Sequence, residues 1–418
     1  MNKILPAIGL GILLSLPSYS QRTCGTNENY QNMINNNPAL RQQLENVDAE
    51  TNLRHDVTTH RTMTIVTIPV VVHVIHDNEA VGTGSNISDV QVLSQIEALS
   101  EDFRLNNADS LMPGHPFWQF TSDVLIEFCL AKQTPNGQAT TGIDRQVGGL
   151  GWTMADINAW VKPQTIWDPS RYLNLWSIDF GGSSSSLLGY AQFPGGPDST
   201  DGVVIGYHYF GYLGNVTPPF DYGRTATHEV GHWLGLRHIW GDATCGDDFI
   251  SDTPPQEASN SGCPSFPYNA FNTCGSDANG EMFMNYMDYV DDRCMVMFTY
   301  EQAVKMNTSL YGPRASLISS NACATPNPGV EENEIFAQNI SLYPNPSNGL
   351  LKVQIKDIST GTLQIKVTAI SGRLVKTFTF NNFTSSLSLD ISELNNGLYL
   401  MQFSQHQLTT TKKISLIK

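Results

Sequence analysis

The sequence lacks long apolar stretches after its first twenty residues, and it has few basic residues. Lysine and arginine number 23 against 39 aspartate and glutamate residues, which gives a net charge of −16 over 418 residues. Nucleic acid and anionic lipid repel such a chain, so we expect neither as a partner. Because no later run is long enough to cross a bilayer, we expect no transmembrane segment. The acidic excess suits extracellular solubility and hard cations such as calcium.

Cysteine is also scarce, since the chain has only seven, and an odd count leaves at least one thiol without a partner in the chain. The first twenty residues have the features of a signal peptide. Lys3 supplies a positive start, residues 4–16 form a short apolar run, and Ser18 and Ser20 are small residues at the cleavage-defining positions. We therefore predict cleavage before Gln21 and export, which permits disulfides.

The secondary-structure pattern changes along the chain. Residues 21–61 are polar and rich in Asn and Gln, which predicts one or two short helices lying on another part of the protein. The nearly continuous β-branched run at 64–76 predicts a strand covered on both faces. Ser88 and Gln91 form a capping box before a helix with one apolar face. Short apolar runs between about 115 and 210 predict further strands.

The last hundred residues have a different composition. Residues 324–337 have the Pro, Asn and Glu content of a linker. Residues 338–418 contain period-2 strands such as "GLLKVQIKDI", "LQIKVTAI" and "LYLMQFS", separated by turns, which predict a small all-β sandwich. A generic adhesion or carbohydrate-binding module is one interpretation of this domain.

The segment "TATHEVGHWLGLRHIWGD" carries the clearest chemical pattern. His228 and His232 are four residues apart, so on a helix both imidazoles project from one face and can share a metal ion. Gly235 ends such a helix in a left-handed conformation, which lets His238 supply a third nitrogen. Three neutral imidazoles with an open position predict a catalytic zinc ion. Glu229 is placed to hold and deprotonate a water, as a general base does.

This HExxHxxGxxH pattern resembles the metzincin signature, and "MNYMDY" supplies the downstream Met-turn. Together with "DTP" and "DDRCMVMF", it is similar to the pappalysin branch of the metzincins over residues 64–320. The resemblance implies a zinc metalloendopeptidase with an α+β fold, in which a mixed twisted sheet is combined with an active-site helix and backing helices. It also implies that Met287 packs beneath the zinc and that Tyr289 stabilises the tetrahedral intermediate. An edge strand at 187–194 is our candidate for pairing with a protein or peptide substrate.

Four cysteines fall in the loop-rich region after the zinc helix, and spacing alone leaves all three of their pairings open. The resemblance favours Cys245–Cys274 and Cys263–Cys294. Cys129 and Cys323 are candidates for a third bridge.

The segment "CGDDFISDTPPQ" offers oxygen ligands for a structural calcium ion. The candidate ligands are Asp247, Asp248, Asp252 and the Thr253 backbone, and the resemblance also implies calcium there. An acidic, solvated loop is the alternative.

Substrate selectivity is expected to depend on the Met-turn loop. If Arg293 faces the cleft, we expect a preference for acidic or neutral substrate residues. Asp291 or Asp292 could dominate instead, because a carboxylate there favours basic residues.

The pieces "ISLYPNPSNGLLKVQI", "AISGRLVKTF" and "TTTKKISLIK" resemble the sorting domain of the type IX secretion pathway of Gram-negative bacteria. This resemblance implies that the exporter recognises the domain, including Lys412 and Lys413, and that the domain is removed during export. The mature protein is then secreted or attached to the outer surface, and we expect it to be monomeric.

The stretch "RTCGT" near the N-terminus resembles the cysteine-switch element of other metzincin propeptides. The resemblance implies that Cys24 binds the zinc in a latent precursor while Arg22 anchors the segment to an acidic group. A disulfide from Cys24 to Cys129 or Cys323, or an idle thiol, are the alternatives. Cleavage near Arg54 or Arg61 would release the segment.

These patterns predict five parts of the chain. They are a signal peptide (1–20), an inhibitory propeptide (21–61), a zinc metalloprotease domain (62–323), a linker (324–337) and a sorting domain (338–418). Two alternative functions are a catalytically inactive cell-surface binding or adhesion protein on the same scaffold and a zinc hydrolase acting on substrates other than peptides.

Overall fold

The computed structural model describes residues 22–55, 64–269, 274–275, 279–326, 330–356, 361–381, 384–406 and 408–418. The predicted signal peptide and Arg61 lie outside the described residues. The chain divides into two compact units, of which the first ends at Ala324 and the second covers Thr325–Lys418 together with the short segment Asn136–Ala139. Within the described ranges, none of the helices combines the length and apolarity that crossing a bilayer requires.

The first unit is built on a mixed six-stranded sheet in the order β2-β1-β4-β6-β5, with β3 also paired to β1. All its pairings are parallel except that of β5, which runs antiparallel to β6 at the edge. The strands are β1 (Val66–His76), β2 (Ile126–Leu130), β3 (Ile143–Val147), β4 (Leu173–Ile178), β5 (Gly189–Ala191) and β6 (Val203–Gly206). This arrangement confirms the predicted mixed sheet.

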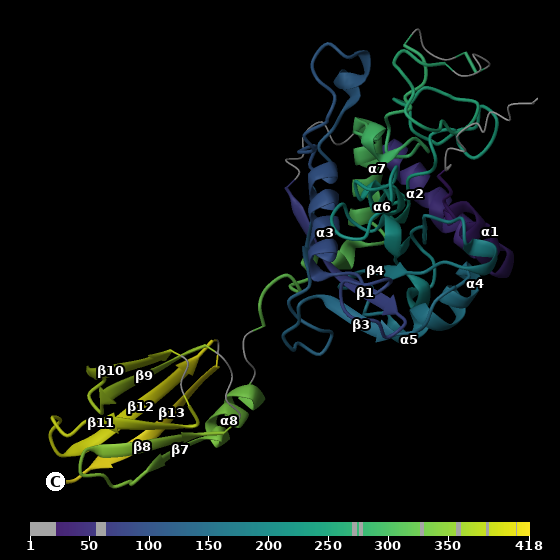
Figure 1. Ribbon diagram of the computed structural model, residues 1–418. Coiled ribbons are helices and arrows are strands. Elements are labelled where there is room, and N and C mark those ends of the chain that lie inside the picture. Colours follow the sequence, from purple (N-terminus) through teal and green to yellow (C-terminus); the bar gives the residue numbers. More distant parts are fainter. Residues whose placement is uncertain are drawn as a thin grey trace, which may run out of the picture. The chain divides into compact units, whose positions relative to one another are not determined.

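Strand β1 is buried along almost its whole length, as its β-branched run predicted. One of its faces packs against the long helix α3 (Asp89–Phe103) and against α6 (Arg224–Trp233). The opposite face is covered by the short helices α4 (Met154–Asp156) and α5 (Lys162–Thr165), with a π-helical turn (Ile157–Val161) between them. Figure 1 shows α3 and α6 together on one side of the sheet.

Helix starts in this unit follow local capping chemistry. The Ser88 side chain accepts a hydrogen bond from the Gln91 amide at the start of α3. Thr299 and Gln302 form a full capping box at the start of α7 (Tyr300–Tyr311). Short 3-10 helices lie in the loops between the helices and strands of this unit. They are Pro116–Phe120, Gly182–Ser184, Asp198–Thr200, Tyr207–Tyr209, Asp292–Cys294 and Ala315–Ser319.

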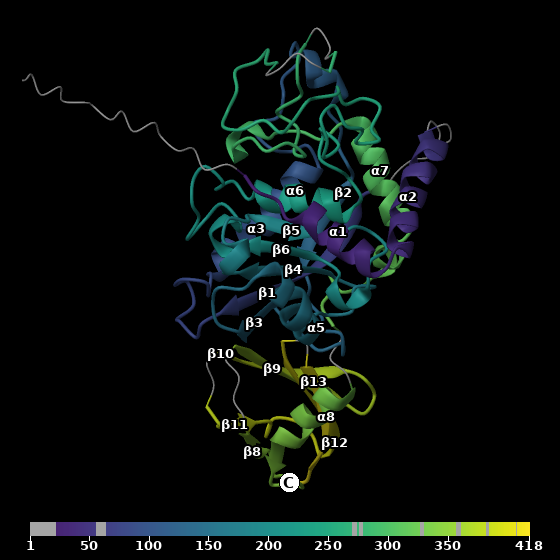
Figure 2. The same cartoon turned by 90° about the vertical axis from the view of Figure 1, so that its right-hand side faces the viewer.

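The polar N-terminal segment forms the two helices that its sequence predicted, α1 (Thr26–Asn36) and α2 (Ala39–His55). Helix α1 lies beside β5, and α2 lies alongside α7 (Figure 2). Arg54, one of the predicted processing points, lies near the end of α2.

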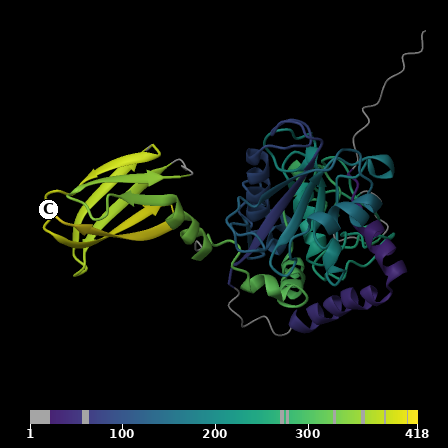
Figure 3. The same ribbon diagram turned by 90° about the horizontal axis from the view of Figure 1, so that it is seen from below.

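The second unit is a β-sandwich of two antiparallel sheets, in the orders β10-β9-β12-β13 and β11-β8-β7. Figure 3 shows the two sheets of this unit face to face. The strands are β7 (Ile340–Tyr343), β8 (Leu350–Ile355), β9 (Thr362–Ala369), β10 (Leu374–Asn381), β11 (Ser386–Asp390), β12 (Gly397–Gln405) and β13 (Leu408–Leu416). Alternate apolar residues of β8, β9 and β12 form the core, which confirms the predicted all-β sandwich. The stretch predicted as a linker contains most of a helix, α8 (Val330–Asn339).

Candidate metal centre

Three histidine side chains meet at the C-terminal end of α6. The helix places His228 and His232 on one face, with their Nε2 atoms 3.1 Å apart. Gly235 follows the helix with φ +97°, the left-handed conformation that the sequence predicted. The turn that Gly235 allows brings the Nε2 of His238 to within 3.1 Å of the Nε2 of His232.

The Nδ1 atom of each ring is already engaged. His228 donates to the Tyr286 carbonyl and His232 to the Leu236 carbonyl, both at 2.7 Å. His238 donates to Asp242, and the Nδ1–Oδ1 distance is 2.5 Å. These bonds fix the tautomers, so all three Nε2 lone pairs point into the same space.

Sequence reasoning missed Asp242. Its spacing, four residues after His238 in "HIWGD", is a signal that could have identified it. A carboxylate on the distal nitrogen of a metal-binding histidine orients the ring and raises its basicity.

The donor set fits zinc. Burial lowers the pKa of His232 to about 3 and that of His228 well below its usual value, so both rings are neutral at neutral pH. Nitrogens bound tetrahedrally to one zinc ion lie about 3.3 Å apart, close to the observed spacing. Three lone pairs facing each other at this distance repel unless a cation lies between them.

Cys24 and Glu229 complete the centre. The Cys24 sulfur and the three histidine nitrogens all lie within 4.8 Å of one another. One Glu229 oxygen accepts hydrogen bonds from the Thr26 hydroxyl at 2.8 Å and from the Cys24 thiol at 3.4 Å. Burial raises the pKa of Glu229 to about 7, although both hydrogen bonds oppose this. Burial and the nearby Glu229 raise the pKa of the Cys24 thiol.

The Met-turn lies directly beneath α6. Met287 is fully buried, and a Cβ at Gly231 would lie 2.7 Å from its sulfur. The Tyr289 ring packs edge-on against His238, with centroids 5.0 Å apart, and also contacts Trp240. Burial raises the pKa of the Tyr289 phenol, so the hydroxyl is protonated and able to donate.

The segment around Cys24 pairs with the sheet edge. The Leu188 amide donates to the Thr23 carbonyl at 3.0 Å, and the Gly25 amide donates to the Gly189 carbonyl at 2.9 Å. This is a parallel bridge to β5, the strand predicted to pair with substrate. The N-terminal segment therefore covers the edge of β5 beside the three histidines.

Arg22 fixes the same segment on the other side of Cys24. Its guanidinium forms an ion pair with Asp292 and donates to the Thr225 hydroxyl at 3.2 Å and to the Val290 carbonyl at 3.4 Å. The Phe220 ring centre lies 4.9 Å from the guanidinium carbon. The acidic partner that the sequence left unnamed is thus Asp292.

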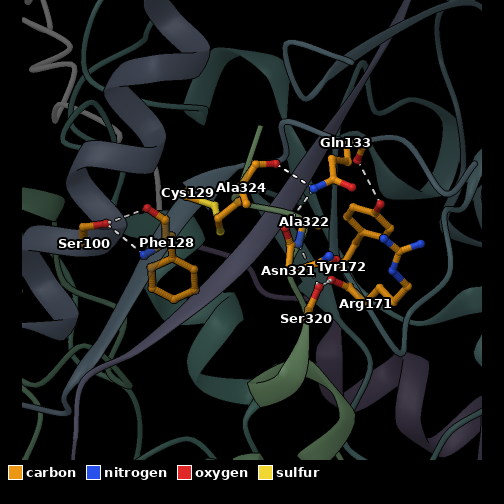
Figure 4. Close-up of a disulfide and its surroundings, with 11 residues drawn as sticks. Ser100, Phe128, Cys129, Gln133, Arg171, Tyr172, Ser320, Asn321, Ala322 and Ala324 are labelled. Carbon is orange, nitrogen blue, oxygen red and sulfur yellow. Dashed lines mark hydrogen bonds between the residues drawn. A yellow bond between two sulfur atoms is a disulfide. The ribbon is translucent and has the colours of Figure 1, made fainter. Parts of the chain in front are cut away.

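Six cysteines form three disulfides. The pairs Cys245–Cys274 and Cys263–Cys294 are those that the resemblance favoured. Cys129 pairs with Cys323, so neither is available to Cys24, which is the one free cysteine of the seven. Figure 4 shows this third disulfide and its surroundings, where the Gln133 amide donates to the Asn321 and Ala324 carbonyls.

The predicted calcium ligands lie within residues 247–253, where each carboxylate accepts hydrogen bonds. Asp248 accepts hydrogen bonds from the Thr253 hydroxyl, while Asp252 accepts from the Glu301 amide at the start of α7. Asp247 caps the Phe249 amide. Among the described residues, the only cluster of three or more potential metal-binding His, Cys, Asp and Glu side chains is the one at the three histidines. Such a cluster counts side-chain ligands and leaves out the Thr253 backbone, so calcium at these residues stays a prediction.

Arg293 lies in the 3-10 turn Asp292–Cys294 of the Met-turn loop. Its side chain is 64 % exposed, and its nearest acidic group is Asp291 at 3.9 Å. A part for Arg293 in substrate selectivity stays a prediction.

Comparison with known proteins identifies the class. Residues 157–311 match the model of the family described as pregnancy-associated plasma protein-A, and residues 341–418 match a secretion system C-terminal sorting domain. An extracellular metalloprotease of Arthroderma otae is 31 % identical over 248 residues, which cover 58 % of this chain and 76 % of that protein. One of Coccidioides posadasii is 39 % identical over 146 residues, or 32 % and 48 % of the two chains.

Two solved structures are similar to the first unit. Mature mirolysin of Tannerella forsythia, in complex with a cleaved peptide, is 44 % identical with a TM-score of 0.57, and the match covers 64 % of this chain and all of that one. A mutant of promirolysin from the same organism is 41 % identical with a TM-score of 0.61, and the match covers 71 % and 97 %.

The fold, the matched family and these relatives together define a secreted metalloendopeptidase of the metzincin class. Within that class, the chain belongs to the pregnancy-associated plasma protein-A (pappalysin) family, and it carries a type IX sorting domain at its C-terminus. The family implies zinc as the metal.

Proposed function

We propose that the protein is a zinc-dependent endopeptidase made as a latent precursor, in which its own N-terminal segment occupies the active site. The convergence of the three Nε2 atoms with the Glu229 carboxylate and the Cys24 thiol carries this proposal. His228, His232 and His238 would hold the ion, and Cys24 would be its fourth ligand before activation.

The chemistry follows from the residues around that ion. Zinc held by three imidazoles supplies a Lewis acid that polarises the scissile carbonyl and lowers the pKa of water. Glu229 accepts a proton from the attacking water and returns it to the leaving amine. Tyr289, whose phenol stays protonated, donates a hydrogen bond to the oxyanion that develops on the carbonyl.

Latency in this proposal has three local causes. Cys24 fills the position that water needs, and Glu229 is engaged by Thr26 and Cys24. The backbone of the segment also occupies the edge of β5, to which an extended peptide would otherwise add as a strand. Cleavage near Arg54 or Arg61 would free the segment, after which Cys24 dissociates.

Substrate preference in this proposal depends on the pocket that holds Arg22. Asp292 forms its base, with the Thr225 hydroxyl and the Val290 carbonyl as further acceptors. After the segment leaves, these acceptors favour an arginine or lysine side chain of the substrate. We assign this preference to Asp292, because Arg293 is exposed to solvent.

The test compares the wild-type protein with the Glu229→Ala and Glu229→Gln variants after processing. We expect casein and gelatin cleavage to fall by about two to four orders of magnitude in both variants, because the general base is lost. Zinc content and circular dichroism serve as controls, since neither is expected to change in the shape-conserving Gln variant. Equal activity in mutant and wild type would remove the proposed mechanism.

A further inference from the structure

A second ion-paired cluster joins the N-terminal segment to the first unit, away from the three histidines. Asp48 of α2 lies with one carboxylate oxygen 2.7 Å from the Arg237 guanidinium and the other 2.7 Å from the Lys305 ammonium. The Asp48 and Lys305 side chains are 8 % and 0 % exposed, and that of Arg237 is 26 % exposed. The Asp48 carboxylate therefore forms ion pairs with both Arg237 and Lys305.

Both cations contact helix α2 through Asp48. Figure 2 shows α2 alongside α7, the helix that carries Lys305. The Phe249 ring forms one wall, with its centre 4.3 Å from the Arg237 guanidinium carbon and 5.7 Å from the Lys305 nitrogen. The Asp248 carbonyl accepts from Lys305 at 3.4 Å. Once Asp48 is withdrawn, a buried ammonium and a partly buried guanidinium lose their shared counter-charge, which is costly.

The Arg237 guanidinium has one hydrogen-bond donor that Asp48 leaves unused. Asp48 accepts from its Nη2 atom, while its Nε atom is buried and has no hydrogen-bond partner among the described residues. A guanidinium presents Nε and Nη2 as parallel donors, and a carboxylate that meets both forms the stronger bidentate pair.

The pocket lies at the end of the path that the N-terminal segment follows from the metal centre. Asn29 donates to the Ala191 carbonyl at the end of β5, and the Tyr30 ring packs against Phe193 two residues further. Arg237 itself directly precedes His238. A peptide that replaces this segment along β5 therefore approaches Arg237.

We propose that Arg237 and Lys305 form a carboxylate-binding pocket, which Asp48 fills in the precursor and which an acidic side chain of a substrate peptide enters in the processed enzyme. The inference rests on the proposed function, since the segment must leave before the pocket opens. It assigns Arg237 and Lys305 a role in selectivity that is separate from the Arg22 pocket.

The first test measures binding and needs no catalysis. Full-length Glu229→Ala precursor is cut with added trypsin, and the released N-terminal segment is removed. A fluorescent peptide of residues 22–55, in wild-type and Asp48→Asn forms, is then titrated by anisotropy. We expect the Asp48→Asn peptide to bind at least tenfold more weakly.

The same titration is repeated on the Arg237→Gln, Arg237→Lys and Lys132→Gln chains. The difference between the two peptides should shrink in Arg237→Gln, where only the Lys305 pair remains, and shrink less in Arg237→Lys. It should be unchanged in Lys132→Gln, which removes an exposed cation elsewhere. Equal binding of both peptides to the wild-type chain, or a difference that is as large in Arg237→Gln as in the wild type, would overturn the pocket.

The second test concerns the substrate. Glu is compared with Gln at each position of a cleaved peptide, using wild-type and Arg237→Gln enzyme. We expect one position at which Glu raises kcat/KM at least fivefold in the wild type only. Absence of such a position overturns the substrate assignment. Competition by acetate but not chloride, with no preference for Glu, would show a site for free carboxylates instead and also overturns it. A processed wild type that cleaves no peptide, but still distinguishes the two segments, overturns the proposed function and leaves the pocket supported.

Discussion

Arg22 and Asp292 lie 270 residues apart in the sequence and form an ion pair whose side chains are 1 % and 0 % exposed. Asp292 is further held by the backbone amides of Tyr222 and Arg224, so its position is fixed whether or not Arg22 is present. The pocket around Asp292 is thus preformed, and the Asp292 carboxylate loses its ion pair once Arg22 leaves.

Substrate selectivity should depend on Asp292. In the processed enzyme, Asp292→Asn is expected to lower kcat/KM for a peptide with arginine in this pocket by about tenfold to a hundredfold, because one hydrogen bond to a charged group is lost. A matched peptide with norleucine should change little. An arginine preference that survives the substitution would show that another group selects it.

Latency should depend on Cys24. We expect the Cys24→Ala precursor to cleave a fluorogenic peptide before any processing, because the sulfur ligand and its hydrogen bond to Glu229 are both lost. An uncut precursor must be verified by mass spectrometry at the end of the assay. A Cys24→Ala precursor that remains fully latent would contradict the switch and leave Arg22 and the β5 pairing as the inhibitory contacts.

Metal affinity should depend on Asp242. The Asp242→Asn variant is expected to bind zinc about ten- to a hundredfold more weakly, since the carboxylate that orients His238 is lost. Titration with a competing chelator measures this directly. The Asp247→Asn variant is the matched control, because Asp247 caps a loop amide and contacts none of the histidines. Equal affinity in both variants would remove the assigned role of Asp242.

Stability should vary with pH through Asp102. Burial raises its pKa from 3.8 to about 6, although the nearby Arg224 guanidinium opposes the shift. Between these values the folded state binds a proton that the unfolded state does not. The contribution of Asp102 to the free energy of unfolding is therefore fully present below about pH 4, and it is lost as the pH rises through about 6.

The measurement compares the free energies of unfolding of wild type and Asp102→Asn from pH 4 to 7. Relative to the variant, the wild type should lose roughly 3 kcal/mol over this range. Asp109 provides a control of opposite sign. Burial raises its pKa, but Arg224 more than offsets this and holds it below its usual value. Relative to Asp109→Asn, the wild type should gain stability as the pH rises toward about 4 and should then stay level from pH 4 to 7. Equal slopes for both variants would contradict the assignment.

Local patterns predicted the elements that carry the metal centre. The β-branched run gave β1, and the four-residue spacing of His228 and His232 placed them on one helical face. Gly235 has the left-handed φ that its place after the helix required. Each of these follows from sequence neighbours, because helix and strand periodicity fix which side chains share a face.

Two ion pairs that the sequence did not predict join residues that are distant in the chain. Asp48 meets Lys305 across more than two hundred residues, and Asp292 meets Arg22 across a similar distance. No spacing rule selects one carboxylate among 39 acidic residues for such a pair. The choice between Arg293 and Asp292 likewise required the orientation of the turn Asp292–Cys294, which buries one side chain and exposes the other.

The disulfide Cys129–Cys323 has a consequence for the end of the first unit. Cys323 lies one residue before the boundary at Ala324, and its bond to β2 fastens this point covalently to the central sheet. After a cut anywhere between residues 325 and 339, the new C-terminus is therefore still held to the sheet by the disulfide, and α7 does not unfold from that end. If the sorting domain is removed during export, the exact position of the cut is therefore not critical for the first unit.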